Sequence, residues 1–538
     1  MERYDAVFVG SGHNALITAA YLARAGWSVL VLEKNDRPGG LVRTEELTLP
    51  GFKHDVYSAA HPLFVTGAAY ADLGAELAAR GLEYLNTDLP TGVSLPDGRT
   101  AVLPRDAGAA VAEFERLSPG DGARFGAMMQ EFGAYAGDVF SLFNLDLSSG
   151  QAQKTIRGLM DAPEGTGFSE FAAEFMTSAR DVLEARFRSP VAQAMIAPWV
   201  MHLGRTPDGA NGGFWVPLTL MALMGGGMAV PRGGSEMLAK ALVRLIEDHG
   251  GVVRTDTPVE RILVGGGRAT GVRTAGGDEI RAARAVVASV NPDQLYLRLL
   301  ADADVPAPLV RQSGRYRYGR GCVQIQLALS EAPRWADERF ARVGQPHLTP
   351  GMEAVTLGIT HALNGYLPVE PTVSLDTPTN LDPSRAPEGK AILRLQMLEI
   401  PCRPRGDAAG TIDVGDGTWT EDLKERWADR VLDVVERHLP GVRDTVLARH
   451  VTSPDDLARY NPNCGPGDPY GGSHDLSQSY LFRPLPGQPG HRTAVPNVFM
   501  VGAATWPGHG VNGGSGYIVA KQLLEDGPER SPVQTVRL

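Results

Sequence analysis

The chain has 538 residues, more than one simple hydrophobic core usually supports, so two domains are expected. Hydrophobic residues make up 43% and charged residues 21%, as in an ordinary globular protein. The net charge of −11 comes without a long basic run, which argues against a nucleic-acid partner and against strong attraction to an anionic membrane.

The N-terminal pattern predicts a β-α-β unit. Residues 4–9 form an apolar run that ends at Gly10, and residues 13–25 carry small and apolar side chains at helical spacing. Gly26 is a suitable helix stop, and residues 28–32 form a second apolar run. A unit of this size is typical of a nucleotide-binding site.

The next long stretch, residues 76–229, is interpreted as helical and irregular. Within it, residues 210–231 carry no charge and contain Pro217 and a glycine triplet, which a membrane-spanning helix would tolerate poorly. Three interpretations stay open for this apolar segment. It lines an apolar substrate cavity, it touches a membrane face, or it is plain core.

An amphipathic helix is predicted over residues 235–248, because apolar residues recur there at helical spacing. Strands are expected after it, at residues 251–254, 258–264, 270–274, 278–282 and 285–290.

Farther along, residues 322–329 and 391–399 predict strands. A helix is expected near 420–438, where Thr418 and Glu421 have capping-box spacing.

Near the C-terminus, residues 497–501 predict a buried strand, Gly502 ends it, and residues 514–525 predict a helix.

These elements indicate an α/β fold with two domains. The first is a discontinuous Rossmann-type domain made of residues 1–75, 230–300 and 490–538. The second is an α+β substrate domain made of residues 76–229 and 301–489.

A dinucleotide-binding motif lies in the first turn, as Gly10-x-Gly12-x-x-Ala15. The first glycine permits a tight turn, the second lets the backbone approach a pyrophosphate, and Ala15 lets the helix pack against the sheet. Glu33, 23 residues after Gly10, is placed to accept hydrogen bonds from a ribose diol. The alternative is a glycine-rich turn with a solvated glutamate.

A second glycine pair, Gly39-Gly40, follows Glu33 by six residues. In a large class of FAD proteins, a pair at this distance lets the backbone pass beside the pyrophosphate and the ribityl chain. A simple turn is the alternative interpretation, and the position six residues after Glu33 favours a functional role.

A third glycine-rich loop, residues 501–516, lies between a predicted strand and a predicted helix. Reduced flavin carries negative charge near N1 and O2, which a helix N-terminus stabilises. The backbone amides of Val511 and Asn512 are the candidate donors, and the sequence predicts that this loop closes over the flavin.

Together these segments resemble the FAD-dependent phytoene desaturase and amine oxidase superfamily, most closely its carotenoid desaturase and desaturase-like ketolase branch. The segments that carry the resemblance are residues 10–33, 38–40, 51–55, 230–242 and 501–516. The pair His13-Asn14 is more specific than the bare fingerprint, and Val259 falls where this family contacts the adenine through its backbone. From the motifs and the resemblance, the residues expected around FAD are Gly10, Gly12, His13, Asn14, Glu33, Lys34, Gly39, Gly40, Leu41, Val42, Val259, Gly502, Val511 and Asn512.

Two departures from the family pattern matter. Leu41 stands where amine oxidases usually have arginine, which argues against a standard amine oxidase. His509 interrupts the usual glycine run, which Trp506 precedes, and puts a bulky, titratable group near the flavin, which counts against a carotenoid substrate.

Hydride transfer to flavin N5 mainly requires a substrate C–H held against the ring. Candidate acid-base residues are His61 and His509, because a histidine titrates near neutral pH. The alternatives are a packing role for His61 and a structural contact in the loop for His509. No metal-ligand spacing is present, so no metal is expected.

The leading hypothesis is an FAD-dependent oxidoreductase that oxidises or desaturates an apolar small molecule. The second is an amine or amino-acid oxidase, for which Arg43 is the nearest carboxylate-binding candidate. The third is a non-catalytic escort module that binds lipid.

Because only one dinucleotide fingerprint is present, oxygen or a quinone is expected to take the electrons, and a net isomerisation is a further alternative. Three separated cysteines and the absence of a visible signal peptide favour the cytoplasm, with peripheral membrane contact left open.

Overall fold

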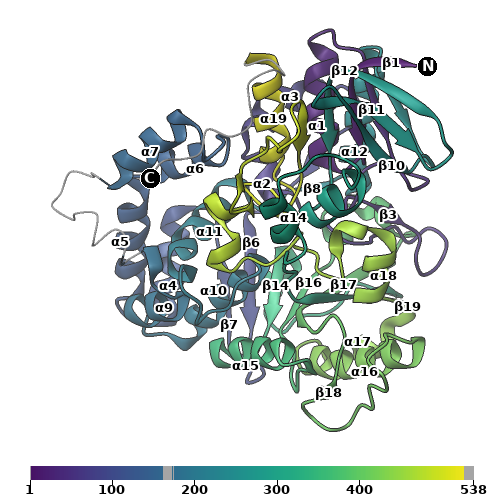
Figure 1. The fold of residues 1–538 in the computed structure, drawn as a ribbon. Helices are drawn as coiled ribbons and strands as arrows, with labels where there is room; N and C mark the ends of the chain where they lie inside the picture. Colours follow the sequence, from purple (N-terminus) through teal and green to yellow (C-terminus); the bar gives the residue numbers. More distant parts are fainter. Residues whose placement is uncertain (1, 161–172, 174, 526–538) are drawn as a thin grey trace.

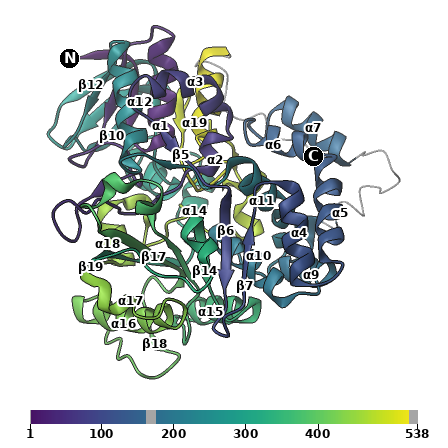
Figure 2. The same ribbon diagram turned by 180° about the vertical axis from the view of Figure 1, so that it is seen from behind.

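The computed structural model describes residues 2–160, 173 and 175–525. Two seven-stranded sheets organise these residues, one in the upper and one in the lower half of the views in Figures 1 and 2. All strands of the first sheet fall in the three segments predicted to bind the dinucleotide, and all strands of the second fall outside them. The boundaries between the two domains stay a prediction.

The first sheet has the strand order β10-β11-β12-β1-β2-β9, with β22 beside β12. Its strands are β1 (Arg3–Val9), β2 (Val29–Leu32), β9 (Val252–Arg254), β10 (Val259–Gly265), β11 (Arg268–Thr274), β12 (Glu279–Ala288) and β22 (Val498–Met500). The pairs β1–β2, β1–β12, β2–β9 and β12–β22 are parallel. The short apolar runs that form β2 and β22 are wholly buried, as expected for parallel strands that are covered on both faces.

Four helices pack with one face of this sheet in a common core, and Figure 1 shows them side by side. They are α1 (His13–Arg24), α3 (Ala68–Ala78), α12 (Glu236–Asp248) and α19 (Gly514–Glu525). The predicted amphipathic helix is α12, and it buries Leu238, Leu242 and Leu245. The opposite face is covered by η1 (Leu295–Leu299) and α14 (Ala307–Ser313).

The second sheet has the order β19-β13-β17-β16-β14-β6-β7, and only β6 and β14 in it run parallel. Its strands are β6 (Leu89–Ser94), β7 (Thr100–Leu103), β13 (Gly321–Leu329), β14 (Val343–Leu348), β16 (Val373–Asp376), β17 (Ala391–Ile400) and β19 (Val446–Thr452). The helix α16 (Glu421–His438) packs on it through the buried Trp427. Next to these lie α15 (Met352–Leu363), α17 (Val442–Thr445) and α18 (Pro454–Tyr460).

Helices from the first half of the chain complete the molecule at one side of the second sheet (Figures 1 and 2). They are α4 (Ala107–Leu117), α5 (Asp121–Gly133), α6 (Ala136–Leu142), α7 (Gly150–Met160), α9 (Ala179–Arg186), α10 (Pro190–His202) and α11 (Gly212–Gly226). The remaining short elements are β3 (Thr44–Glu45), β4 (His54–Asp55), β5 (Tyr84–Leu85), β8 (Val230–Pro231), β15 (Tyr366–Leu367), β18 (Gly406–Asp407), β20 (Pro484–Leu485), β21 (Gln488–Pro489), α2 (Pro62–Val65), α13 (Pro292–Gln294), η2 (Glu338–Arg342), η3 (Pro378–Asn380), η4 (Pro383–Arg385), η5 (Pro462–Cys464), η6 (Leu476–Gln478) and η7 (Tyr480–Phe482).

Three expectations about secondary structure need correction. The helical interpretation of residues 76–229 missed β6 and β7, because Pro90 and Gly92 interrupt the strand pattern and β6 is buried on both faces. The two strands expected at 278–282 and 285–290 are one continuous strand, β12. The cap of α16 is Thr420, whose hydroxyl accepts from the Leu423 amide at 3.2 Å, and not Thr418.

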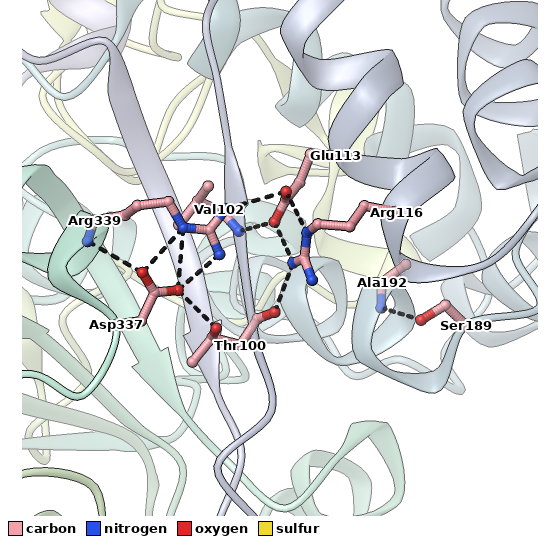
Figure 3. Close-up of polar contacts among 8 residues, drawn as sticks. All are labelled: Thr100, Val102, Glu113, Arg116, Ser189, Ala192, Asp337 and Arg339. Atoms are coloured by element: carbon pink, nitrogen blue, oxygen red, sulfur yellow. Dashed lines mark hydrogen bonds and ion pairs between the residues drawn. The ribbon is translucent and has the colours of Figure 1, made fainter.

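A group of polar side chains, which we call the edge cluster, lies beside the edge strand β7 (Figure 3). It consists of Thr100, Glu113, Arg116, Asp337 and Arg339. Glu113 is 7% exposed and accepts from the Val102 amide at 3.1 Å, from Arg116 at 2.7 Å and from Arg339 at 3.1 Å. The cluster therefore ties α4 and β7 to the turn η2.

Asp337 is the second carboxylate of the edge cluster. It accepts from the Thr100 hydroxyl at 2.7 Å and from Arg339 at 2.7 Å. The hydrogen bond from the Arg339 guanidinium lowers the pKa of Asp337 to about 2.

Candidate flavin site

The first glycine loop lies at the carboxyl end of β1, where α1 begins. Gly10 has a φ of 88°, and a side chain on Gly12 would come within 3.2 Å of the Ser289 hydroxyl beyond β12. The N-terminus of α1 has no side-chain cap and no acidic residue in its first turn. Such an end is suited to a phosphate, because the backbone amides and the helix dipole favour an anion.

The second glycine pair rests on the first loop. Gly39 and Gly40 have φ values of 122° and 61°, and the Gly39 amide donates to the Ser11 carbonyl at 3.0 Å. A Cβ on Gly40 would lie 3.2 Å from the Gly12 Cα. The two loops thus meet backbone to backbone, and a larger residue would fill the space beside the first turn.

Glu33 is buried at the end of β2. One carboxylate oxygen accepts from the Ser11 amide at 2.9 Å and from the Ser11 hydroxyl at 2.6 Å, and the other accepts from the Asn35 amide at 3.0 Å. The Thr257 amide donates to the Glu33 carbonyl at 2.7 Å, which brings the segment leading to Val259 alongside. Lys34 is exposed. Ribose and adenine binding by these residues stays a prediction.

The third glycine loop, between β22 and α19, lies against the start of α1. The Gly516 amide donates to the Asn14 side-chain oxygen at 3.0 Å, and the Thr18 hydroxyl donates to the Gly516 carbonyl at 2.9 Å. A Cβ on Gly516 would press into the Asn14 carbonyl oxygen. The structure therefore brings the first and last glycine loops together, as the sequence predicts.

A cavity of about 280 Å³, which we call the glycine-loop cavity, lies where these loops meet. The residues of the predicted FAD set that line it are Gly12, His13, Asn14, Gly40, Leu41, Val42, Gly502 and Val511. The other members of the set do not line it, namely Gly10, Glu33, Lys34, Gly39, Val259 and Asn512.

The backbone donors in and beside this cavity fit a flavin, and of the two candidates Val511 lines it while Asn512 does not. Within the described residues, the backbone amides of Val511 and Asn512 have no hydrogen-bond partner. They precede α19, which has no acidic residue in its first turn. Unpartnered amides at such a helix end can stabilise negative charge on a ligand ring.

A second cavity of about 300 Å³, which we call the apolar cavity, adjoins the first. The two cavities share Ser58, Ala60, His202, Gln345, His509, Gly510 and Val511. The helix α11 contributes Trp215, Leu218 and Leu223 to the apolar cavity. The apolar segment 210–231 therefore lines a cavity, which was one of its three interpretations.

His509 lies at the junction of the two cavities. Its Nε2 faces the His202 carbonyl, and its Nδ1 lies 2.9 Å from Nε2 of His474. Burial lowers the pKa of His509 to about 4. The ring is therefore neutral at pH 7, with Nε2–H donating to the carbonyl and Nδ1 accepting from His474.

His61 lies outside the linings of both cavities. Its Nδ1 is 2.9 Å from the Tyr84 hydroxyl and its Nε2 is 2.9 Å from the Ser235 hydroxyl. Burial lowers the pKa of His61 to about 3. These contacts favour the packing interpretation, and we do not propose His61 as an acid or base.

Sequence reasoning missed the polar residues that line the apolar cavity beside His509, among them His202, Arg205, His474 and Arg483. They follow no motif. For Arg205 a signal existed, because it is the only Asp, Glu, Lys or Arg between residues 189 and 207. A lone charge in so apolar a stretch is unusual for plain core.

Comparison with known proteins agrees with this geometry. A family model described as flavin containing amine oxidoreductase matches residues 16–524. The phytoene desaturase (neurosporene-forming) of Cereibacter sphaeroides is 27% identical, with 97% of this chain and 95% of the relative covered. One of the limonene dehydrogenase polypeptides of Castellaniella defragrans is 24% identical, with 98% and 95% covered.

Among solved structures, putrescine oxidase has a TM-score of 0.61 at 15% identity, with 97% of this chain and 99% of that chain covered. An oxidoreductase from Methanosarcina mazei has a TM-score of 0.61 at 16% identity, with the same coverage. These two likenesses establish the fold. Because the family model spans almost the whole chain, the protein belongs to the flavin containing amine oxidoreductase family and is an FAD-dependent, phytoene-desaturase-like oxidoreductase.

Proposed function

We propose that this chain oxidises or desaturates a largely apolar small molecule bound in the apolar cavity. One observation carries the proposal. The apolar cavity shares residues with the glycine-loop cavity, including His509 and Val511. A ligand in the apolar cavity therefore reaches the edge of the glycine-loop cavity. Aromatic and aliphatic side chains such as Phe143, Trp215 and Leu218 form much of its wall.

Bound FAD supplies a hydride acceptor at its N5 atom. The task of the chain is then to hold one substrate C–H bond at the junction and to keep water away. The buried walls of the apolar cavity can do both, because they position the substrate and exclude water. His509 stays our candidate for handling the accompanying proton, although its low pKa makes it a weak base at pH 7.

An amine or amino-acid oxidase has less support. The Arg43 side chain is paired with Glu45, lies 4.7 Å over the Tyr460 ring, and lines neither cavity. An amine oxidase would also need an aromatic cage, and Tyr57, which lines the glycine-loop cavity, is stacked on Tyr460 at 5.1 Å. The escort alternative is set aside, because the chain belongs to a family of enzymes.

We infer that oxygen or a quinone takes the electrons, since the sequence has one dinucleotide fingerprint. A net isomerisation is the alternative, and a prolycopene isomerase of Daucus carota is 24% identical over 95% of this chain. Throughout residues 2–160, 173 and 175–525, no helix is both long and apolar enough to cross a membrane. Peripheral membrane contact and a cytoplasmic location stay predictions.

The test is anaerobic reduction of the purified holoprotein by apolar polyenes and terpenes, with phytoene and limonene as first probes. We expect the visible flavin absorbance to bleach and the product to lose two hydrogens. A product of unchanged mass would indicate isomerisation. Reduction by amines alone, or a protein that takes up no FAD, would overturn the proposal.

A matched pair of variants on α11 locates the substrate. Leu218 lines the apolar cavity, whereas Leu220 is buried on the same helix without lining it. We expect Leu218→Ala to change KM for the apolar substrate and Leu220→Ala to lower stability without changing KM. If Leu218→Ala left KM at the wild-type value, as Leu220→Ala should, the substrate would bind elsewhere.

A further inference from the structure

Arg205 lies in the wall of the apolar cavity, in the loop between α10 and α11. It is 8% exposed, and within the described residues its guanidinium makes no ion pair or hydrogen bond. Its backbone is fixed, because Arg320 donates to its carbonyl at 3.0 Å and its amide donates to the Val200 carbonyl at 3.1 Å. Burying an unpaired guanidinium is costly, so its presence calls for a partner.

The rest of the cavity wall supplies no negative charge. No Asp or Glu is among the described residues that line it. The other arginine of the wall, Arg483, donates to backbone carbonyls, among them that of Ala503 at 2.6 Å. The nearby carboxylate of Asp475 is exposed and pairs with Arg317 at 3.2 Å.

The histidines of the wall do not compensate the arginine either. Burial lowers the pKa values of His202, His474 and His509, so these rings are neutral at pH 7. The cavity therefore holds uncompensated positive charge, and burial lowers the pKa of Arg205 without neutralising it.

A purely structural role for Arg205 would be to hold the aromatic walls. Its guanidinium lies 5.6 Å from the Trp215 ring centre and 6.0 Å from that of Tyr480, near the outer limit of a cation–π contact. Those rings are already fixed by Asn211, which accepts from the Trp215 indole at 3.2 Å and from the Tyr480 hydroxyl. Holding these rings therefore does not explain why the position carries a charge.

We propose that Arg205 binds the carboxylate end of an otherwise apolar substrate. The guanidinium can donate two parallel hydrogen bonds to a carboxylate, and the apolar walls can cover the tail. Anchoring one end would fix which C–H bond of the tail reaches the junction at His509. This inference rests on the proposed function, since it assigns the apolar cavity to the substrate.

The experiment compares three ligands of one chain length with the FAD-loaded protein, namely dodecanoate, methyl dodecanoate and dodecan-1-ol, by isothermal titration calorimetry. We expect wild-type protein to bind the acid at least about tenfold more tightly than the ester or the alcohol. Arg205→Met should remove this preference while leaving the ester Kd unchanged, and Arg205→Lys should retain part of it. Arg334→Met, at an exposed position, is the control and should change nothing.

Equal wild-type affinities for acid and ester would overturn the inference, and so would a preference that survives in Arg205→Met. Acetate binding as tightly as dodecanoate would also overturn it, because the tail would then contribute nothing. If Arg205→Met failed to retain FAD, the wild-type comparison alone would decide. Acid preference without any flavin reduction by apolar substrates would refute the proposed function and leave the carboxylate subsite standing.

Discussion

The edge cluster and the wall of the apolar cavity differ in whether their buried charges are paired. Glu113 in the edge cluster and Arg205 in the cavity are 7% and 8% exposed. Glu113 has three donors around it (Figure 3), whereas the guanidinium of Arg205 has no hydrogen-bonding partner among the described residues. A charge that is paired within the chain supports the fold, and one left unpaired in a cavity is available to a ligand.

The largest effect is expected in the third glycine loop, where the Val511 and Asn512 amides are also unpartnered within the described part of the chain. Gly516→Ala would push α19 away from Asn14, because there is no room for a Cβ. We expect loss of bound FAD and a fall in unfolding free energy of about 3 kcal/mol. The FAD-to-protein ratio and urea unfolding measure both.

Gly158→Ala on α7 is the matched control, since nothing lies within 4 Å of a Cβ at that position. It should keep FAD and gain slightly in stability, because alanine favours a helix. Retention of FAD by Gly516→Ala would show that the two helix ends need not meet.

The next effect is expected in the edge cluster. Glu113→Ala would remove the acceptor that Arg116, Arg339 and the Val102 amide share and would leave the Val102 amide unpaired, at a cost of about 2 kcal/mol in unfolding free energy. FAD affinity should not change. Glu353→Ala, whose side chain is 80% exposed, is the control and should stay within about 0.5 kcal/mol of wild type. A fall in FAD affinity would mean that the cluster also shapes the cofactor site.

A smaller effect should depend on pH. The pKa of Asp337 is lowered to about 2, so its contribution to stability is present above its ordinary value of 3.8 and is lost as pH falls toward 2. We expect Asp337→Asn to lose about 1 kcal/mol at pH 7 and to approach wild type in acid. Urea midpoints at several pH values test this, and a difference that is constant with pH would contradict it.

The smallest effect on stability should come from Arg205→Met. Since this change removes an unpaired buried charge, the unfolding free energy of the holoprotein should stay equal or rise by about 1 kcal/mol. Thermal unfolding with saturating FAD measures it. A loss of unfolding free energy comparable to that of Glu113→Ala would identify Arg205 as a structural residue. The two buried charges would then not differ in role.

Much of the cofactor region could be predicted from the sequence, because glycines in turns and apolar runs in parallel strands are local signals. Residues 10–15 and 501–516 could be predicted to meet because both loops carry motifs of one flavin site, although hundreds of residues separate them. The second sheet was harder. Its strand β6 contains Pro90 and Gly92, which local patterns associate with turns.

The roles of individual polar residues in the two cavities could not be assigned from the sequence. His61 and His509 looked alike in the sequence, and only their tertiary contacts separate a packing residue from one at the cavity junction. Arg205 stood in no motif, and its lack of a partner is a property of the folded chain.

The hydrogen bond between Gly516 and Asn14 joins residues 502 positions apart. A ribosome must therefore synthesise almost all of this chain before the loops around the glycine-loop cavity can close. A nascent or prematurely terminated polypeptide that ended before Gly502 would lack the residues that the third glycine loop contributes to this cavity, among them Gly502 and Val511. Retention of FAD then reports on synthesis of the chain through the third glycine loop.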